Sequence, residues 1–277
     1  MGKKDSYNPF VSVIIATYNE PPDFITKSLR SIMEQSYPHL EIIVADDSTD
    51  KRTKDAIDKL ASEDNRIQVI RHEQRMGFVN ALNNALHQAK GELIARMDGD
   101  DISSPNRISL QVEYAREHPD IDLFGSSMYI INEEGDVISE RNYPTTKWGI
   151  YKMFLYRSPF SHPTVMLKRD IIDNGFYYNP NYKRAEDVDF YIRLWQKGYH
   201  FGNLPDKLLK YRVVDDMGRK RTKEQWIYNH KARKKIIWRK PIFTVLSYII
   251  SLIYIHIPKR VVSSYYKKEN KKRTYNK

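Results

Sequence analysis

The stretch Glu92-Leu-Ile-Ala-Arg-Met-Asp-Gly-Asp-Asp101 joins a short apolar run to three carboxylates. The apolar part is too short for a helix and predicts a strand. Three carboxylates within four residues repel one another, and Gly99 lets the backbone turn sharply between them. A cation is the natural reason to gather them, and hard oxygen ligands select Mg²⁺ or Mn²⁺ over softer metals. An EF-hand is disfavoured, because its spacing and distal glutamate are missing.

Three similar segments precede this strand. Residues 11–16, 41–45 and 67–70 predict strands, and helical spacing follows each of them. Four alternating strands and helices predict an α/β fold with an open, mainly parallel sheet and helices on both faces. Ligands of such sheets bind outside the carboxyl ends of the strands. Acidic residues occupy these positions, so we expect the functional site there.

After residue 120 the pattern changes to an α+β extension, which would complete a cleft over the first sheet. Residues 121–131 and 137–138 predict a hairpin, and a helix is expected from about Ala185 to Lys197, ending at Gly198. Before this change, Ser104-Pro105 predicts the start of another helix, with serine as N-cap and proline at the first helical position.

Charge divides the chain into two parts. The chain carries 46 Lys and Arg against 35 Asp and Glu, but residues 218–277 hold 18 of the basic residues and only two acidic ones. We therefore expect a mildly acidic domain over residues 1–217 and a basic helical tail over 218–277. The absence of cysteine excludes disulfides, thiolate metal sites and a cysteine nucleophile. The polar first ten residues do not resemble a secretory signal, so a cytoplasmic domain is expected.

Two further acidic clusters also lie at the ends of predicted elements, one after a strand and one at the start of a helix. Asp46-Asp47 follows the second strand, where such a pair is also typical of a turn or a helix cap. Glu186-Asp187 begins the late helix, where acids favour the helix dipole or could supply a general base. Spacing does not separate these alternatives. No glycine-rich phosphate loop occurs, so a nucleotide diphosphate would have to be held through a cation.

Four ordered motifs together resemble the family 2 glycosyltransferases of GT-A fold over roughly residues 10–215. They are Ser12-Val-Ile-Ile-Ala-Thr-Tyr-Asn19, Ile43-Val-Ala-Asp-Asp-Ser-Thr-Asp50, Ala95-Arg-Met-Asp-Gly-Asp-Asp101 and Ala185-Glu-Asp-Val-Asp189. His162-Pro-Thr-Val-Met166 and the chain length resemble the bacterial exopolysaccharide and capsule branch of that family.

The resemblance implies roles for the residues of the first half. Thr17 and Asp47 would contact the nucleobase, with Asp46 beside them, and Arg75 could reach the nucleotide. Asp98 would face the ribose or belong to the metal shell. Residues 10–120 would form the nucleotide-binding half of the domain, and residues 121–217 the acceptor-binding half.

The remaining roles concern the metal and the acceptor. Asp100 would be the principal ligand of Mn²⁺ or Mg²⁺, and Asp187 would deprotonate the acceptor hydroxyl. Glu186, His162 and Asp215 are further candidates for the acceptor site or for residues around the metal. Family members often have a histidine shortly after the segment Tyr211-Arg-Val, whereas here Val-Asp-Asp follows. Either an aspartate replaces it, or the metal has one protein ligand fewer.

The activity implied is an inverting, metal-dependent transfer of a hexosyl group. The expected donor is a nucleotide-diphosphate sugar, in particular a UDP-sugar, and the expected acceptor is a lipid-linked saccharide in exopolysaccharide or capsule biosynthesis. The Gln-x-x-Arg-Trp signature of processive synthases is missing, so a single addition per binding event is expected. Two alternatives remain: an interaction or regulatory protein acting on a membrane machine, and a metal-dependent nucleotidyltransferase that would release pyrophosphate.

The tail predicts a membrane partner. Residues 242–257 are mostly apolar but shorter than the roughly twenty residues of a spanning helix, and basic residues flank them within 231–273. A helix lying in an anionic leaflet satisfies both flanks. We therefore expect peripheral or monotopic attachment to the cytoplasmic face of the cell membrane; a true span and a soluble helical partner surface are the alternatives. Nucleic acid is not an expected partner, because the site acids would repel phosphate.

Overall fold

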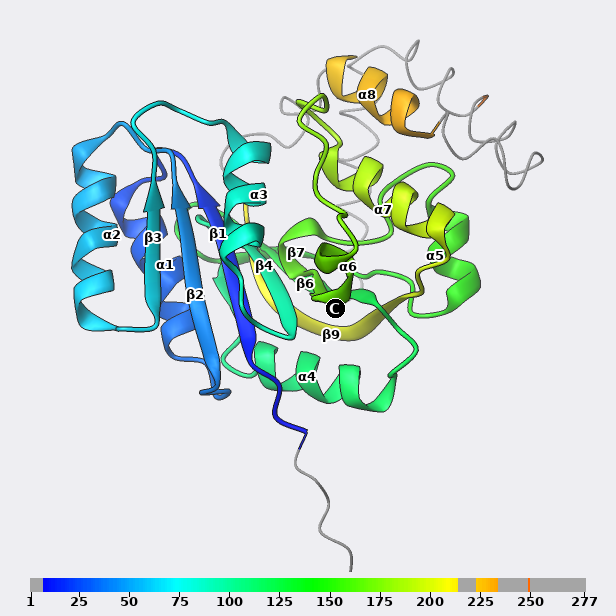
Figure 1. The fold of residues 1–277 in the computed structure, drawn as a ribbon, viewed down its shortest axis with the longest axis horizontal. Helices are drawn as coiled ribbons and strands as arrows, with labels where there is room; N and C mark the ends of the chain where they lie inside the picture. The colour runs from blue at the N-terminus through cyan, green and yellow to red at the C-terminus, as the bar shows by residue number, and fades with distance from the viewer. Residues whose placement is uncertain (1–6, 214–222, 234–248, 250–277) are drawn as a thin grey trace, which may run out of the picture.

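The computed structural model describes residues 7–213, 223–233 and 249. Within this part of the chain, nine strands form one sheet, ordered β3-β2-β1-β4-β8-β6-β9-β5, with β7 paired to β6 (Figure 1). The sheet is continuous across the boundary between the two predicted halves, because β8 pairs with both β4 and β6. The two halves therefore form one body around a shared sheet.

The first half is a parallel α/β unit, as predicted. Its strands are β1 (Val11–Thr17), β2 (Leu40–Asp46), β3 (Ile67–Arg71) and β4 (Leu93–Asp98). Its helices are α1 (Pro22–Met33), α2 (Lys51–Glu63) and α3 (Phe78–Gln88). The central strand β1 pairs in parallel with both β2 and β4, so the strand order reverses beside it. This reversal is the topological switch point where such sheets bind ligands.

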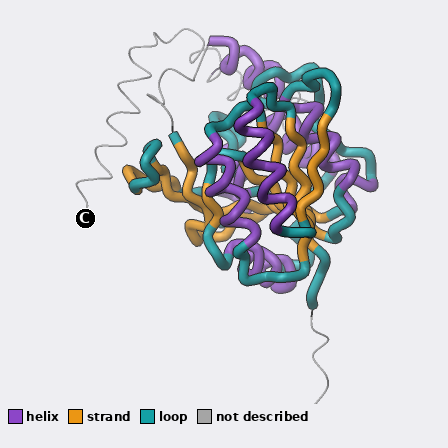
Figure 2. Tube along the Cα trace, turned by 90° about the vertical axis from the view of Figure 1, so that its left-hand side faces the viewer, coloured by secondary structure: helices purple, strands orange, loops and turns teal. Residues whose placement is uncertain are grey.

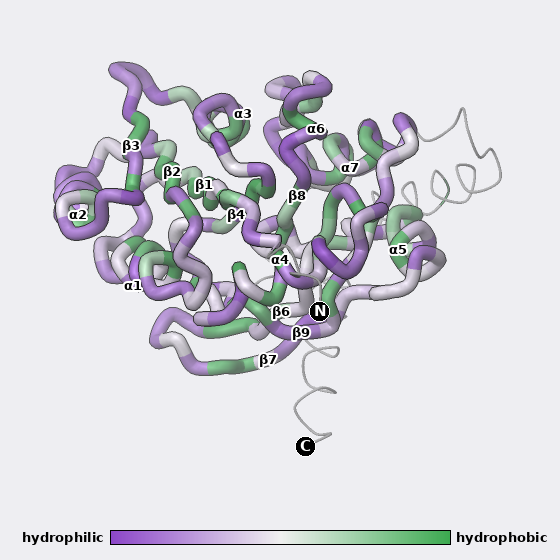
Figure 3. Tube along the Cα trace, turned by 60° about the horizontal axis from the view of Figure 1, so that its bottom comes forward, coloured by the Kyte–Doolittle hydropathy of each residue, from purple (hydrophilic) through white to green (hydrophobic). Residues whose placement is uncertain are grey.

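Alternating residues of the central strands supply two cores. Ile14 and Ala16 of β1 pack on the face covered by α3, whereas Val13 and Ile15 pack on the face covered by α1 and α2. Figure 2, a view from the β3 edge, shows helices lying against the strands. Figure 3 shows hydrophobic residues concentrated along the sheet and hydrophilic residues over the outer helix α2. Because β1 is buried on both faces, its position within the fold is strongly determined.

The described chain after β4 adds five strands to the same sheet, which becomes mixed, and five further helical segments before α8. The strands are β5 (Ile102–Ser103), β6 (Leu123–Ile131), β7 (Val137–Arg141), β8 (Met166–Lys168) and β9 (Phe201–Arg212). The helical segments are α4 (Arg107–Glu117), α5 (Lys147–Met153), the 3₁₀ turn η1 (His162–Thr164), α6 (Asp170–Asp173) and α7 (Glu186–Lys197). The predicted hairpin is β6–β7, and α7 ends at Gly198 in the left-handed conformation, as predicted.

The predicted start of a helix at Ser104-Pro105 was wrong. The helix α4 begins at Arg107, with Asn106 at its N-cap position. Ser103 instead lies in β5 opposite Leu209 of β9, and the backbone N–H of Ser104 donates to the Leu208 carbonyl at 2.9 Å. Pairing with β9 therefore keeps these residues extended and delays the helix.

Part of the segment predicted as a tail packs on the domain. Helix α8 (Lys223–Arg233) lies against α7 (Figure 1). Arg233 is buried, and its Nε donates to the Phe154 carbonyl at 2.9 Å. The apolar stretch 242–257, apart from Ile249, and the position of Asp215 lie outside the described residues. Among the helices that are described, none is both long and apolar enough to cross a bilayer.

Candidate active site

The register of three parallel strands brings the predicted site residues to one edge of the sheet. Thr17 lies opposite Asp46 on the neighbouring strand β2, and Ala16 lies opposite Asp98 on β4. The loops that leave these strands therefore start side by side. Asn19 joins two of them: its Oδ1 accepts from the backbone N–H groups of Thr49 and Asp50, at 2.7 and 2.8 Å. Asn19 adopts the left-handed conformation, which asparagine tolerates better than most residues.

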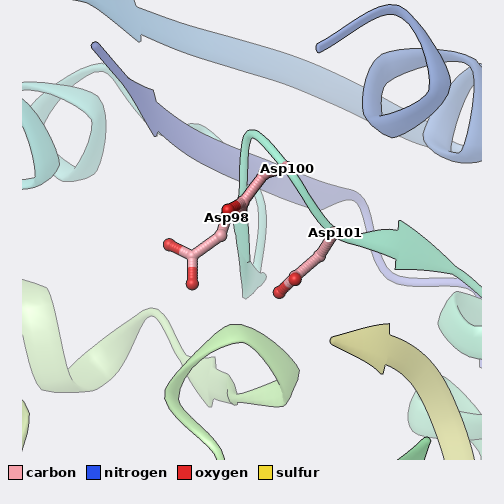
Figure 4. A group of neighbouring side chains, drawn as sticks. All are labelled: Asp98, Asp100 and Asp101. Atoms are coloured by element: carbon pink, nitrogen blue, oxygen red, sulfur yellow. The ribbon is translucent and has the colours of Figure 1, made fainter. Parts of the chain in front are cut away.

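The three carboxylates after β4 form a candidate cation site. One carboxylate oxygen from each of Asp98, Asp100 and Asp101 lies within 4.8 Å of the other two, along the turn that follows the strand (Figure 4). Asp101 is fully buried and its Oδ2 has no hydrogen-bond partner. Burial and the two neighbouring carboxylates raise the pKa of Asp101 well above its ordinary value. Clustered hard oxygens with one buried oxygen unsatisfied suit Mg²⁺ or Mn²⁺.

Buried arginines surround this cluster. The guanidinium of Arg96 on β4 pairs with Asp98, while its Nε and Nη1 have no hydrogen-bond partner. The backbone N–H of Arg212 donates to Asp101 Oδ1, and its Nε donates to the Asp100 carbonyl, both at 2.9 Å. Arg107 Nη2 donates to the Arg96 carbonyl at 2.8 Å. These contacts fix the acidic turn between β4 and β9 and offset part of its charge.

A cavity of about 200 Å³ lies over the carboxyl ends of β1 and β4. Thr17, Asp47, Arg75, Asp98 and Asp100 line it, so the structure brings together five of the residues predicted to contact a nucleotide or a metal. Further lining residues include Tyr18, Glu20, Phe78 and Tyr211. The guanidinium carbon of Arg75 lies 3.6 Å from the ring centroid of Tyr18, a cation–π contact at the wall of the cavity.

The two aspartates after β2 play different parts. Asp47 lines the cavity and accepts from the backbone N–H groups of Met76 and Gly77, at 3.2 and 2.6 Å. Asp46 does not line it: its Oδ2 accepts from Arg71 Nε at 2.7 Å, and its Oδ1 accepts from the Ser48 N–H at 2.9 Å. Asp46 is thus buried and held in an ion pair with the partly exposed Arg71 of β3, beside the residue that faces the cavity.

A second, larger cavity of about 480 Å³ adjoins the first. Asp98, Phe78 and Tyr211 line both cavities, so the acidic turn lies in their common wall. The larger cavity is also lined by Arg96, and by His162, Glu186 and Asp187, the residues predicted for the acceptor side. The two adjoining cavities can therefore hold two substrates, with Asp98 between them.

The start of α7 presents two of its three acids to the larger cavity. Ala185, which precedes the helix, adopts the left-handed conformation with φ of 58°, a strained state for a residue other than glycine. Glu186 and Asp187 line the cavity, whereas Asp189 is buried and paired with Arg193 at 2.8 Å. Asp189 is thus held by an ion pair within α7, whereas Glu186 and Asp187 are the two acids of this helix that face the cavity.

The electrostatics of these acids differ from those of exposed carboxylates. Burial raises the pKa of Asp187, although backbone hydrogen bonding and the nearby Arg96 partly offset that rise. Burial, followed by repulsion from Asp187, raises the pKa of Glu186 to about 7. A carboxylate with a raised pKa is a stronger base at neutral pH than an ordinary one.

His162 has a packing role as well as a place in the cavity wall. Its Nε2 lies 2.8 Å from the Tyr178 hydroxyl, so the two groups share a hydrogen bond. Burial and the positive charge of Arg96 lower the pKa of His162 well below its ordinary value, which keeps the ring neutral.

Sequence reasoning missed several residues of the site. Arg96, Tyr18, Glu20 and Phe78 were not singled out. Arg96 carried a usable signal, because an arginine inside an otherwise apolar buried strand needs a polar reason. Glu20 carried none: its role depends on contacts with Thr17 Oγ1 and the Tyr18 N–H, which only the loop conformation creates. Burial, with a smaller contribution from Asp98, raises the pKa of Glu20.

The raised pKa of Glu186 predicts a pH-dependent effect on stability. A carboxyl group that titrates near 7 when folded, but at its ordinary value when unfolded, costs stability as pH rises between the two values. We expect Glu186→Gln to be more stable than the parent protein near pH 8, by up to about 3 kcal/mol, and equally stable near pH 4. Urea unfolding at both pH values measures this difference. The exposed control Glu134→Gln should show no such difference, and a Glu186→Gln effect independent of pH would contradict the assignment.

Comparisons with known sequences identify the family of the chain. The sequence profile described as glycosyl transferase family 2 matches residues 12–184. The chain is 31% identical over 268 residues to the putative glycosyltransferase EpsE of Bacillus subtilis, with 94% of each chain covered. It is 28% identical over 266 residues to the amylovoran biosynthesis glycosyltransferase AmsE of Erwinia amylovora, covering 94% of this chain and 99% of that one.

Solved structures show the same fold. The S. aureus TarS 1–349 complex with UDP-GlcNAc has a TM-score of 0.68 at 22% identity, covering 88% of this chain and 71% of that one. The mannosyltransferase PcManGT of Pyrobaculum calidifontis, in complex with GDP-Man and Mn²⁺, has a TM-score of 0.67 at 21% identity, covering 92% and 72%. These likenesses establish the GT-A fold, and the expected fold class is confirmed. Because the sequence profile spans more than half of the chain, the protein belongs to glycosyl transferase family 2.

Proposed function

We propose that this glycosyltransferase moves a hexosyl group from a UDP-sugar to a lipid-linked saccharide, with inversion at the anomeric carbon, during exopolysaccharide or capsule biosynthesis. The observation that carries the proposal is the pair of adjoining cavities with Asp98 in their common wall. The smaller cavity, beside Asp47 and Asp100, suits a nucleotide diphosphate. The larger, beside Asp187, suits the donor sugar and the acceptor. The UDP-GlcNAc complex of TarS supports a UDP-sugar donor, and the amylovoran biosynthesis glycosyltransferase AmsE supports a role in polysaccharide biosynthesis.

The acidic turn is the proposed holder of a divalent cation. Asp98, Asp100 and Asp101 present the hard oxygens that Mn²⁺ or Mg²⁺ prefers. When bound, the ion supplies positive charge that stabilises a departing nucleoside diphosphate. The Mn²⁺ in the PcManGT complex, which has the same fold, supports this assignment. Arg96 pairs with Asp98 and thus limits the share of that carboxylate available to the ion. Of the other two aspartates, only Asp100 lines the smaller cavity, so Asp100 is the proposed principal ligand.

Asp187 is the proposed general base. A sugar hydroxyl is a weak nucleophile, and a positioned carboxylate that accepts its proton contributes roughly 10²- to 10⁴-fold. The acceptor oxygen then forms a bond to the anomeric carbon while the bond from that carbon to the phosphate oxygen breaks. The proton remains on Asp187, and the electron pair leaves with the nucleoside diphosphate. Burial of Asp187 favours this role, because it makes the carboxylate more basic.

The two alternatives predict different products. A metal-dependent nucleotidyltransferase would release pyrophosphate, and a purely regulatory protein on this fold would release no product from a donor. Retention of carboxylates in both cavities favours an enzyme. Measuring whether UDP or pyrophosphate appears when the protein is given a nucleotide sugar and an acceptor separates the three possibilities.

We also propose that the C-terminal segment attaches the enzyme to the cytoplasmic face of an anionic membrane, through residues 231–273. The reason is the sequence: an apolar stretch between two dense groups of basic residues. Helix α8 packs on α7, so this segment begins next to the larger cavity. Attachment there would keep that cavity near a lipid-linked acceptor.

The metal assignment predicts the behaviour of Asp100→Ala. This change should weaken Mn²⁺-dependent UDP binding at least about tenfold, because it removes the principal ligand. EDTA should have the same effect on the parent protein, and calorimetric titration measures both. The control Asp55→Ala removes an exposed carboxylate on α2 and should bind UDP normally. A UDP affinity that changes neither with EDTA nor in Asp100→Ala would contradict the assignment.

The base assignment predicts the behaviour of Asp187→Asn. This change keeps the shape of the side chain but removes its basicity, so UDP-sugar binding should persist while transfer falls about 10²- to 10⁴-fold. Thermal stabilisation by a panel of UDP-sugars with Mn²⁺ measures binding, and UDP release in the presence of lipid-linked saccharides measures transfer. Full transfer by Asp187→Asn would remove this residue as the base.

The membrane proposal predicts sedimentation with anionic vesicles. The full chain should co-sediment with vesicles that contain phosphatidylglycerol, less so as salt rises, and a chain ending at residue 233 should stay in the supernatant. Equal sedimentation of the two chains, or no sedimentation of either, would exclude this segment as the anchor.

A further inference from the structure

Besides Arg96 of β4, the larger cavity collects basic side chains from four separate segments. Its walls include Arg141 at the end of β7, Arg157 after α5, Lys183 and Arg184 before α7, and Arg233 on α8. These residues lie up to ninety positions apart in the sequence and meet only because the fold brings α5, α7 and α8 to the same side of the molecule (Figure 1). Five cations around one cavity repel one another, so their convergence favours an anionic occupant.

Three of these cations contribute no polar side-chain contact to the fold, within the part of the chain that the structure describes. Arg157, Lys183 and Arg184 line the cavity, but their side chains make no ion pair, hydrogen bond or cation–π contact there. Arg233 differs, because its guanidinium is buried and bonds to the Phe154 carbonyl and to Asn229. The first three are therefore available to a ligand, beside a fourth that is already fixed in place.

The diphosphate of the donor is not the anion that these five basic residues would bind. The smaller cavity, which contains Asp100, has a single basic residue in its wall, Arg75. The five cations line only the larger cavity, where the proposed function places the acceptor. An anion held by them is therefore carried by the second substrate rather than by the nucleotide.

The acids of the larger cavity do not cancel this positive charge. Asp98 is paired with Arg96. Glu186 carries a proton in part of the molecules at neutral pH, because burial raises its pKa to about 7. Arg96 also has two buried nitrogens, Nε and Nη1, without hydrogen-bond partners. Asp187 is the third carboxylate in the wall, and the five cations and Arg96 outnumber the three acids. The cavity thus has positive charge and unused donors in excess of its carboxylates.

We propose that the larger cavity recognises an acceptor that carries a phosphate or diphosphate group, held by Arg157, Lys183 and Arg184. Guanidinium groups suit this task, since their planar donors bind phosphate oxygens in pairs. The proposal rests on the proposed function for the identity of the cavity and adds the chemical class of its acceptor. The phosphate belongs either to a lipid carrier or to a soluble phosphorylated saccharide; both present the same group to the cavity.

The test uses three probes: geranyl diphosphate, inorganic pyrophosphate and geraniol. Each is titrated calorimetrically into the full chain in EDTA, so that no cation links a diphosphate to the acidic turn. The double variant Arg157→Ala/Arg184→Ala is compared with Lys59→Ala, an exposed lysine on α2 at the other end of the molecule (Figure 3). Unfolding temperatures and Mn²⁺-dependent UDP affinity of the same proteins check their folding and the nucleotide site.

We expect geranyl diphosphate to bind and the neutral alcohol not to bind. The double variant should bind geranyl diphosphate at least about tenfold more weakly than the parent protein. Lys59→Ala should bind it as the parent does, and the Mn²⁺-dependent UDP affinity of both variants should be unchanged. Equal binding of pyrophosphate would identify a soluble phosphorylated acceptor, and tighter binding of the prenyl compound a lipid-linked one. Absent diphosphate binding, or binding that the double variant leaves intact, overturns the proposal. If the parent protein does not bind UDP in the presence of Mn²⁺, that result counts instead against the proposed function.

Discussion

Repulsion among three neighbouring carboxylates is the constraint on which the site depends. Carboxylate oxygens of Asp98, Asp100 and Asp101 lie within 4.8 Å of one another at the end of a buried strand, and Asp101 is shielded from water. The fold compensates with buried arginines: Arg96 pairs with the first carboxylate, and Arg212 bonds to the backbone or side chain of the other two. Buried charge without partners would be costly, so the turn and the strands that supply the arginines stabilise one another.

This arrangement also joins the two halves of the domain. Arg212 comes from β9, the long strand of the second half, whereas the aspartates end β4 of the first. Between these elements lie two adjoining cavities, one beside the acidic turn and one beside the start of α7. The smaller cavity gathers carboxylates, and the larger gathers cations around a basic carboxylate. In the proposed mechanism, the smaller cavity takes the cation and the nucleotide, and the larger cavity takes the proton transfer.

The sequence predicted the first half of the fold and the acidic site well, for a physical reason. Buried parallel strands such as Val11–Thr17 are continuous apolar runs, and acids directly after them can only lie at the carboxyl edge of the sheet. The predicted start of α4 failed because pairing of Ser103 with β9 is a long-range contact that local helix signals do not contain. The assignment of structure to Asp189 and chemistry to Asp187 likewise needed the position of Arg193 and of the cavity.

The basic wall of the larger cavity was also hidden in the sequence. Its members belong to segments with no common motif, and the first helix of the presumed tail supplies one of them, Arg233. The sequence showed that the C-terminal segment is basic, but not that its first helix lines the larger cavity. If the proposed membrane attachment and acceptor site hold, one segment of the chain serves both, because α8 lines the larger cavity.

The central claim is that the aspartates after β4 hold a cation that binds the donor diphosphate. Diffraction at the manganese absorption edge, from crystals grown with Mn²⁺ and UDP, tests it most directly. The account predicts an anomalous peak within coordination distance of an Asp100 oxygen and of the UDP diphosphate, with the uracil ring beside Asp47. UDP bound elsewhere, or bound in that cavity without an anomalous peak at the aspartates, would contradict it.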